Sequence, residues 1–357
     1  MKFTLRIIYL FAGPSIASLA ALLLGAVFIL GLGKNPLEVY GLFFTQTFGS
    51  SYGIGQVLFK ATPLMFTGLA AAISFQAGLF NIGAEGQLTV GAFLTAFVGF
   101  SGGGLPSAII IPAALIAGMA GGALWGFIPG ILKARFGAHE VINTIMMNFI
   151  ASALASYMVT NVFLVPASVH TPQIVQAAEI PRLEIFTDAF RGAPVNMSLL
   201  LAVLSCLAIY LLLWKSRPGY ELRATGLSKN AATYGGIHVS RQIVLALTIS
   251  GALAGLVGSN FVLGYKHYFE LGFSEGIGFI GIAVALLAKN HPLGVIATSL
   301  FFGILEYGSL TINTLVPKEL ANILQAIIII FVIILTRLVN RWVKQLQHQA
   351  ALGADHV

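Results

Sequence analysis

Charged residues are scarce in this sequence: Asp, Glu, Lys and Arg make up 9% of its 357 residues, whereas hydrophobic residues make up 57%. A soluble domain usually carries about 25% charged residues. So few charges cannot cover a globule with a solvated surface, so the composition excludes an ordinary soluble fold and indicates that lipid surrounds the chain. The net charge of +7 then reflects membrane orientation, and we expect no nucleic-acid partner.

The sequence also lacks the residues of several common chemistries. Its single cysteine, Cys206, lies in an apolar stretch, which excludes an intrachain disulfide. No Gly-x-x-x-x-Gly-Lys-Ser/Thr phosphate loop is present, so we do not expect this chain to hydrolyse ATP. There is neither a His-Glu-x-x-His motif nor a pair of cysteines at metal-binding spacing. We therefore expect no enzyme activity, no metal and no cofactor in this chain.

Long apolar stretches are abundant instead. A membrane-spanning helix needs about 20 apolar residues, and the 40 glycines are typical of membrane helices that pack closely through small residues. We predict one all-α transmembrane domain over residues 1–357, a polytopic bundle of about ten transmembrane or re-entrant helices. The predicted spans are 7–33, 56–79, 87–101, 106–131, 140–165, 196–214, 242–263, 276–289, 292–314 and 319–337.

Two of these stretches, 87–101 and 276–289, are short for a full crossing. Each either tilts inside the bundle or re-enters without crossing, and both alternatives stay open. Threading ten spans with the N-terminus inside places most of the 19 lysines and arginines in the cytoplasm, as the positive-inside rule expects. We therefore expect both termini in the cytoplasm, a proline-rich external loop at 166–195 and a basic cytoplasmic loop at 215–241.

Ionisable side chains inside apolar helices are functional candidates, because a charge in hydrocarbon is costly. Glu85 lies between two glycines, with Asn81 and Gln87 just outside them. This pattern predicts a broken helix whose freed backbone faces protein or water. Glu85 then either caps neighbouring backbone amides and fixes the break, or contacts solute directly.

Two further polar faces follow. The first carries residues three or four positions apart, which places most of them on one helical face: Glu140, Asn143, Thr144, Asn148 and Ser152. Such a stripe either bonds a neighbouring helix or lines an aqueous path, and Glu140 is close enough to the cytoplasmic end to be solvated. In the ninth span, Glu306, Ser309 and Asn313 share a face. A pore wall is the favoured interpretation there, because the span holds no cation for Glu306.

The cytoplasmic loop contains a short predicted helix. Ser228 is the expected N-cap and Gly235 the expected stop, which frames less than two turns. A helix this short is unstable alone in water, so it needs a partner. Small Ala231 and Ala232 beside the bulkier Tyr234 suit insertion into a groove. The alternative is an interfacial helix lying on lipid.

Three blocks of this sequence resemble the permeases of bacterial ABC importers in the ribose, branched-chain amino acid and nucleoside group, nearest to the larger permease of general nucleoside systems with BMP-type binding proteins. The blocks are Thr62-Pro63-Leu64 through 80–87 to Gly91-Ala92, then 140–148, then 276–287 with Pro292-Leu293-Gly294. The 219–237 loop resembles the family's coupling helix, which docks on the ATPase. This chain has Gly-Leu-Ser-Lys-Asn-Ala-Ala where Gly-x-Asn-Pro-x-Ala-Ala is more usual.

The resemblance implies a multi-pass permease in the bacterial inner membrane that moves nucleosides, or sugars or riboflavin, by alternating access. Its implied partners are an ABC ATPase subunit that holds ATP and Mg, a second homologous permease and an external substrate-binding lipoprotein. The implied coupling residues are Glu221, Leu222, Arg223, Gly226, Ser228, Ala231, Ala232, Tyr234 and Gly236. The candidate solute path comprises Phe80, Asn81, Glu85, Gln87, Asn143, Thr144, Asn148, Glu306 and Asn313.

Two rival functions stay open. A secondary transporter would use Glu85 or Glu306 as a proton or sodium site, and its uptake would collapse with an ionophore. A structural or signalling membrane protein would show no change in response to solute. Under the importer hypothesis, reversing the charge of Glu221 or Arg223 is expected to uncouple ATP hydrolysis from uptake.

Overall fold

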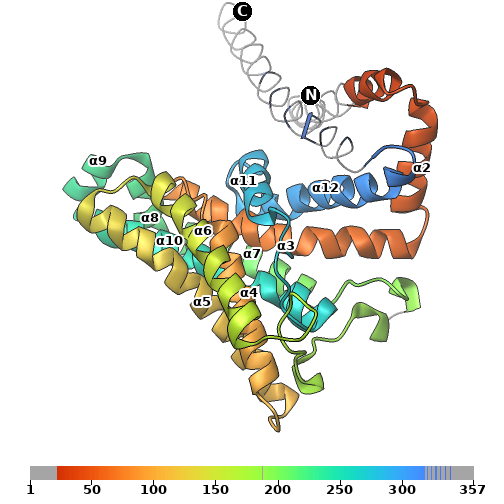
Figure 1. Ribbon diagram of the computed structural model, residues 1–357. Helices are drawn as coiled ribbons and strands as arrows, with labels where there is room; N and C mark the ends of the chain where they lie inside the picture. Colours follow the sequence, from red (N-terminus) through yellow and green to blue (C-terminus); the bar gives the residue numbers. More distant parts are fainter. Residues whose placement is uncertain are drawn as a thin grey trace, which may run out of the picture. The chain divides into compact units, whose positions relative to one another are not determined.

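The computed structural model describes residues 22–186 and 188–317, together with single helical positions between 320 and 338. The described residues form helices joined by loops and contain no β-strand element (Figure 1). They divide into two compact units, one formed by Ser51–Ile304 and the other by the residues before and after it. The beginning of the predicted 7–33 span, most of the 319–337 span and both termini lie outside the described residues.

Six helices in the described part of the chain are long and apolar enough to cross a membrane. They confirm, with shifted ends, the spans predicted between 56 and 79 and in five later stretches. Two of them continue into π-helical turns and one into a 3-10 turn. They are α3 (Ser51–Gln76), α5 (Ser107–Phe136), α6 (Glu140–Tyr157) with η1 (Met158–Val162), α7 (Ser198–Lys215), α10 (Val239–Gly255) with η5 (Ser259–Lys266), and α12 (Pro292–Thr311) with η6 (Ile312–Thr314).

The two stretches predicted to be short are α4 (Ala84–Ser101) and α11 (Ile277–Leu287). The 11 residues of α11 measure only about 16 Å, roughly half of a hydrocarbon core of about 30 Å. One helix, α2 (Pro36–Phe48), was missed in a stretch left as a connection. The Asn35 side chain accepts a hydrogen bond from the Leu37 amide there, and Pro36 follows at the first helical position.

The unit Ser51–Ile304 is built around α3. In an apolar stretch of 18 residues taken from each helix, 89% of the α3 stretch is buried inside the protein, compared with 28% for α5, 22% for α6 and 28% for α7. Protein therefore encloses α3, whereas α5, α6 and α7 present apolar faces suited to lipid.

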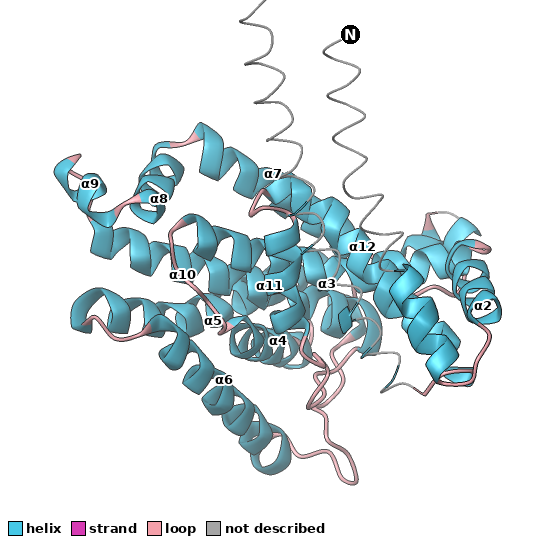
Figure 2. Cartoon of the chain, turned by 90° about the horizontal axis from the view of Figure 1, so that it is seen from above, coloured by secondary structure: helices cyan, strands magenta, loops and turns pink. Residues whose placement is uncertain are grey.

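Helices α5 and α10 approach each other backbone to backbone, and both views show them alongside one another (Figures 1 and 2). A Cβ atom added to Gly122 would lie 2.1 Å from the Gly251 carbonyl oxygen, and one added to Gly255 would lie 2.1 Å from that of Gly118. These glycines repeat every four residues on each helix, the small-xxx-small pattern of membrane helix pairs. The close packing expected from the glycine content is confirmed at this crossing.

The two long loops lie on opposite sides of this unit. The segment 163–197 emerges at one side, and α8 (Arg217–Leu227) and α9 (Lys229–Tyr234) lie at the other (Figure 1). An external loop and a cytoplasmic loop require this arrangement, and the assignment of the two faces stays a prediction.

Candidate functional site

The predicted helix break is present. Helix α3 ends at Gln76 and α4 begins at Ala84, and residues 77–83 between them are not helical. Gly78 adopts a left-handed backbone with φ of +70°, which favours glycine. The freed backbone groups are satisfied within the protein: the Gly83 amide donates to Asn81 Oδ1 at 2.8 Å, and the Ile82 amide to Thr144 Oγ1 at 3.3 Å.

Helix α6 holds the far side of this break through Asn148. Its Oδ1 accepts from the Gly86 amide at 2.8 Å, and its Nδ2 donates to the Ile82 carbonyl at 3.0 Å. Thr144 and Asn148 thus bond the break and the first turn of α4, and whether the α6 polar stripe also lines an aqueous path stays a prediction. The third candidate, Asn143, has its Nδ2 buried and without a hydrogen-bond partner within the described residues.

A buried polar cluster ties the break to α10 and α3. Asn81 Nδ2 donates to Ser250 Oγ at 2.8 Å and to Gln87 Oε1 at 3.1 Å, and Ser250 Oγ donates to the Ala70 carbonyl at 2.7 Å. Asn81 is 3% exposed and Gln87 is 1% exposed. Both side chains therefore bond within the protein in this conformation and do not face an open path.

Glu85 caps a helix that is distant in sequence. Its Oε2 accepts from the Gly278 amide at 2.8 Å in the first turn of α11, and its Oε1 accepts from Ser274 Oγ. A carboxylate at this position also interacts favourably with the α11 dipole. The capping alternative for Glu85 therefore has a geometric basis, but the capped amide belongs to α11 and not to the neighbouring sequence.

The remaining candidates of the solute path are dispersed. Phe80 is 41% exposed, and its ring packs edge-on against Phe75 at 5.4 Å between centroids. Glu140, which is not one of these candidates, lies within 2.8 Å of Lys133 Nζ and forms an ion pair that joins α5 to α6. Glu306 and Asn313 belong to the other compact unit, so their part in a path with the break stays a prediction.

The loop at 215–241 folds into α8 and α9. The predicted short helix is confirmed: Ser228 caps α9 by accepting from the Ala231 amide at 3.3 Å, and the helix ends before Gly235. Helix α8 was missed. Ser216 caps it by accepting from the Gly219 amide, ahead of a proline in the first turn.

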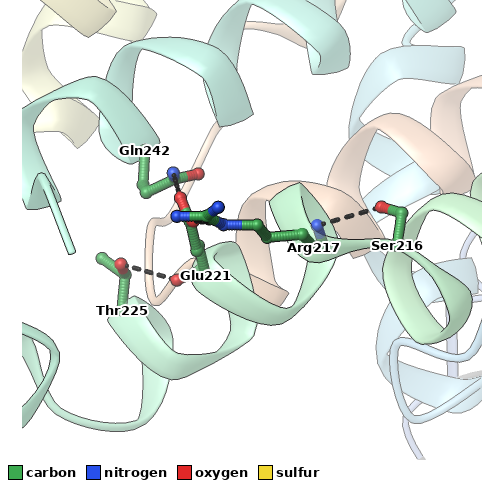
Figure 3. A network of polar contacts seen from close by, with 6 residues as sticks. Ser216, Arg217, Glu221, Thr225 and Gln242 are labelled. Atoms are coloured by element: carbon green, nitrogen blue, oxygen red, sulfur yellow. Dashed lines mark hydrogen bonds and ion pairs between the residues drawn. The ribbon is translucent and has the colours of Figure 1, made fainter. Parts of the chain in front are cut away.

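Polar contacts fasten α8 to the bundle (Figure 3). Glu221 accepts from Arg217 Nε at 2.9 Å and from Gln242 Nε2 of α10 at 2.8 Å. Arg223 Nε donates to the Leu213 carbonyl at 3.0 Å, and its guanidinium lies over the Trp214 ring. Glu221 and Arg223 thus bond within their own chain, so reversing either charge would disturb the placement of α8 as well as any docking.

The outward face of this segment is formed by other side chains. Tyr234 is 95% exposed and Leu227 is 89% exposed, whereas Leu222 and Ala232 are buried. Between α8 and α9 lies a surface cavity of about 400 Å³. Its lining includes Tyr220, Glu221, Ala224, Leu227, Ser228, Ala231, Ala232 and Gly236. A partner can reach this face without unfolding it.

The end of α8 rests directly on the helix break. A Cβ atom added to Gly226 would lie 2.1 Å from the Gln76 carbonyl oxygen and 2.8 Å from the Gly78 nitrogen. Only glycine permits this approach of two backbones. The exposed α8–α9 face and the broken membrane helix are therefore adjacent, which the sequence positions do not reveal.

Comparison of the sequence with known proteins identifies its family. The model of the branched-chain amino acid transport system / permease component family matches residues 53–333. The guanosine ABC transporter permease protein NupP of Bacillus subtilis is 42% identical over 324 residues, covering 89% of this chain and 92% of its own length. The nucleoside ABC transporter permease protein NupB of Lactococcus lactis is 34% identical over 325 residues, 89% of each chain.

A third relative carries a different solute in its name. The glucose ABC transporter permease protein TsgB13 of Haloferax volcanii is 33% identical over 329 residues, covering 90% of this chain and 86% of its own length. The family match over residues 53–333 thus includes nearly all of α3, the break and the α8–α9 segment. The chain belongs to the branched-chain amino acid transport system permease family, and it is a multi-pass, pore-forming ABC transporter subunit rather than an enzyme.

Proposed function

We propose that this chain is a permease subunit of an importer that carries nucleosides across the bacterial inner membrane by alternating access, driven by ATP. Relatives named for guanosine and nucleosides, 42% and 34% identical over about nine-tenths of the chain, support this solute class. Sugars are the second candidate, because TsgB13 is named for glucose. The observation that carries the mechanism is the backbone contact of Gly226 with Gln76 and Gly78, since it joins the exposed segment to a membrane helix.

The complete importer would contain partners that this chain needs for activity. A cytoplasmic ATPase subunit would bind ATP and Mg, a second homologous permease would complete the path, and an external lipoprotein would deliver the solute. This assembly would contain the chain as a single permease domain of about ten helices with both termini in the cytoplasm. That orientation would place α8 and α9 on the side where the ATPase resides.

The ATPase would bind the exposed face of α8 and α9. Tyr234 and Leu227 are large, apolar in their greater part and exposed to 95% and 89%, and exposed aromatic side chains commonly anchor protein interfaces. ATP-driven closure of the ATPase would push this face, and Gly226 would pass the push to the break. The solute path would run beside Phe80, whose half-exposed ring can stack on a base or a sugar face.

Copurification tests the coupling part of this proposal. The chain is expressed with its ATPase, and the ATPase retained on the affinity-tagged permease is measured for the wild type, Tyr234→Glu and Ile185→Glu. Ile185 is also a large exposed side chain, 70% exposed on the opposite loop, so the same change to Glu there is the control. We expect Tyr234→Glu to lose at least 90% of the ATPase and Ile185→Glu to retain it. Equal retention in all three would refute docking at α9.

A further inference from the structure

The helix break is in contact with α8 near its beginning and is followed directly by a residue that contacts α11. At residue 78 it contacts Gly226 of α8, backbone to backbone. Just beyond it, Glu85 in the first turn of α4 contacts the start of α11. The break is therefore a short stretch of chain between the proposed ATPase-binding face and α11, a helix of only 11 residues.

The link from Glu85 to α11 is both polar and steric. Oε2 accepts from the Gly278 amide at 2.8 Å, and Oε1 accepts from Ser274 Oγ in the loop before α11. A Cβ atom added to Gly278 would also lie 2.5 Å from the Glu85 nitrogen and 2.7 Å from its Cα. Hydrogen bonds to an ionised acceptor are stronger than neutral ones. The start of α11 is thus fixed to the start of α4 by the side chain and the backbone of one residue.

The break itself is braced, so it cannot easily absorb a displacement. Asn148 of α6 bonds Ile82 and Gly86 on either side of residue 84, and Asn81 bonds Ser250 of α10. These contacts pair the Gly86 amide, the Ile82 carbonyl and the Asn81 side chain, which a flexible loop would leave to water. A movement entering at Gly78 is therefore passed on to α4.

We propose that Glu85 is a positioning residue that transmits the movement of α8 to α11 and thereby changes the solute path. The inference rests on the proposed function, because it requires the ATPase to act on α8 and α9. It assigns Glu85 to coupling and not to solute binding. Helix α11 is the element that receives the movement, because Glu85 holds its first turn.

The test compares Glu85→Gln with Glu140→Gln in the assembled importer. Both changes remove a carboxylate charge from the first turn of a helix, but Glu140 pairs with Lys133 and has no contact with α11 among the hydrogen bonds and ion pairs of the described residues. Nucleoside uptake and ATP hydrolysis are measured in the same proteoliposomes at saturating solute. A fluorophore is placed on Phe279→Cys, which is 47% exposed on α11, in a Cys206→Ser background.

We expect Glu85→Gln to remain bound to the ATPase, to lower the nucleoside moved per ATP hydrolysed at least tenfold, and to lose the ATP-dependent emission change at position 279. Glu140→Gln is expected to keep the transport ratio within twofold. Gly226→Ala should lower the ratio too, and the double variant Gly226→Ala/Glu85→Gln should be no worse than the poorer single one, because both changes interrupt one relay.

Three results would overturn the inference. If Glu85→Gln raises the KM for solute but leaves the nucleoside moved per ATP hydrolysed unchanged at saturation, Glu85 is a direct solute contact. Uptake and ATP hydrolysis falling in proportion, with the emission change retained, would make its role structural only. Additive effects of the two changes would separate Gly226 from Glu85. If Gly226→Ala does not assemble, the ratio and the emission of Glu85→Gln decide alone. Absence of ATP-dependent uptake by the wild type would instead refute the proposed function.

Discussion

Replacing Gly122 by Ala tests the close packing of α5 on α10. The new Cβ would lie 2.1 Å from the Gly251 carbonyl oxygen and 3.0 Å from the Gly255 Cα. Contacts under 3.0 Å essentially never occur, so α5 and α10 would have to separate by about 0.9 Å, the difference between 3.0 and 2.1 Å. The obstructing atom is the Gly251 carbonyl oxygen, which belongs to the backbone, so no change of side-chain rotamer can relieve the contact.

Two opposing contributions decide the size of the effect. Overpacking of a close contact costs about 1–3 kcal/mol, and a rigid backbone neighbour places this case near the upper end. Ala favours a helix over Gly by about 1 kcal/mol, which offsets part of the cost. We expect a net destabilisation of about 1–2 kcal/mol. For a chain of 357 residues, that corresponds to a lower apparent Tm of about 1–3 °C.

Gly41→Ala is the matched control. Gly41 is also inside a helix, α2, and a Cβ atom there would meet nothing within 4 Å. Only the helix-propensity gain remains, so its apparent Tm should equal or exceed that of the wild type. Thermal unfolding of the purified chain in detergent, followed by size-exclusion fluorescence, measures all three proteins. Equal apparent Tm values for Gly122→Ala and Gly41→Ala would refute the close packing of α5 on α10.

Three further predictions concern the site. Ser228→Ala removes the α9 cap, worth about 1 kcal/mol, and should reduce ATPase retention in copurification, whereas Ser228→Asn should restore it. Asn148→Leu leaves the Gly86 amide and the Ile82 carbonyl unpaired, at about 1–3 kcal/mol for each group. Asn148→Leu should therefore lower the apparent Tm. The control Asn161→Leu, at an exposed asparagine of η1, should not. Equal apparent Tm values for the two variants would contradict the bracing of the break by Asn148. Phe80→Ala should raise the KM for nucleoside uptake severalfold and Phe80→Tyr should not, and an unchanged KM in both would remove Phe80 from the path.

Local signals in the sequence predicted the local structure. Hydropathy located six of the spans, and the glycines around Glu85 located the break, because both depend on neighbouring residues only. Ser228 and Gly235 fixed the limits of α9 for the same reason. Helices α2 and α8 carry equally clear caps at Asn35 and Ser216, and attention to Pro following a capping residue would have found them.

The partners of the polar residues could not be predicted. Glu85 bonds an amide 193 positions away, and Asn81 bonds a hydroxyl 169 positions away, and only the packed helices bring such groups together. The outward direction of Tyr234 and the inward direction of Arg223 likewise follow from how α9 and α8 lie on the bundle. The polar stripe on α6 is compatible with two roles, and only the packed structure brings Thr144 and Asn148 against the break.

The most direct test of the account is uptake by vesicles that contain the chain with its partner subunits. Labelled guanosine is supplied with the binding lipoprotein outside and with ATP inside, in the presence and absence of an ionophore that dissipates ion gradients. The account predicts uptake that requires ATP, disappears when the ATPase subunit is omitted and is unchanged by the ionophore. Uptake that proceeds without nucleotide and collapses with the ionophore would contradict it and identify an ion-coupled transporter.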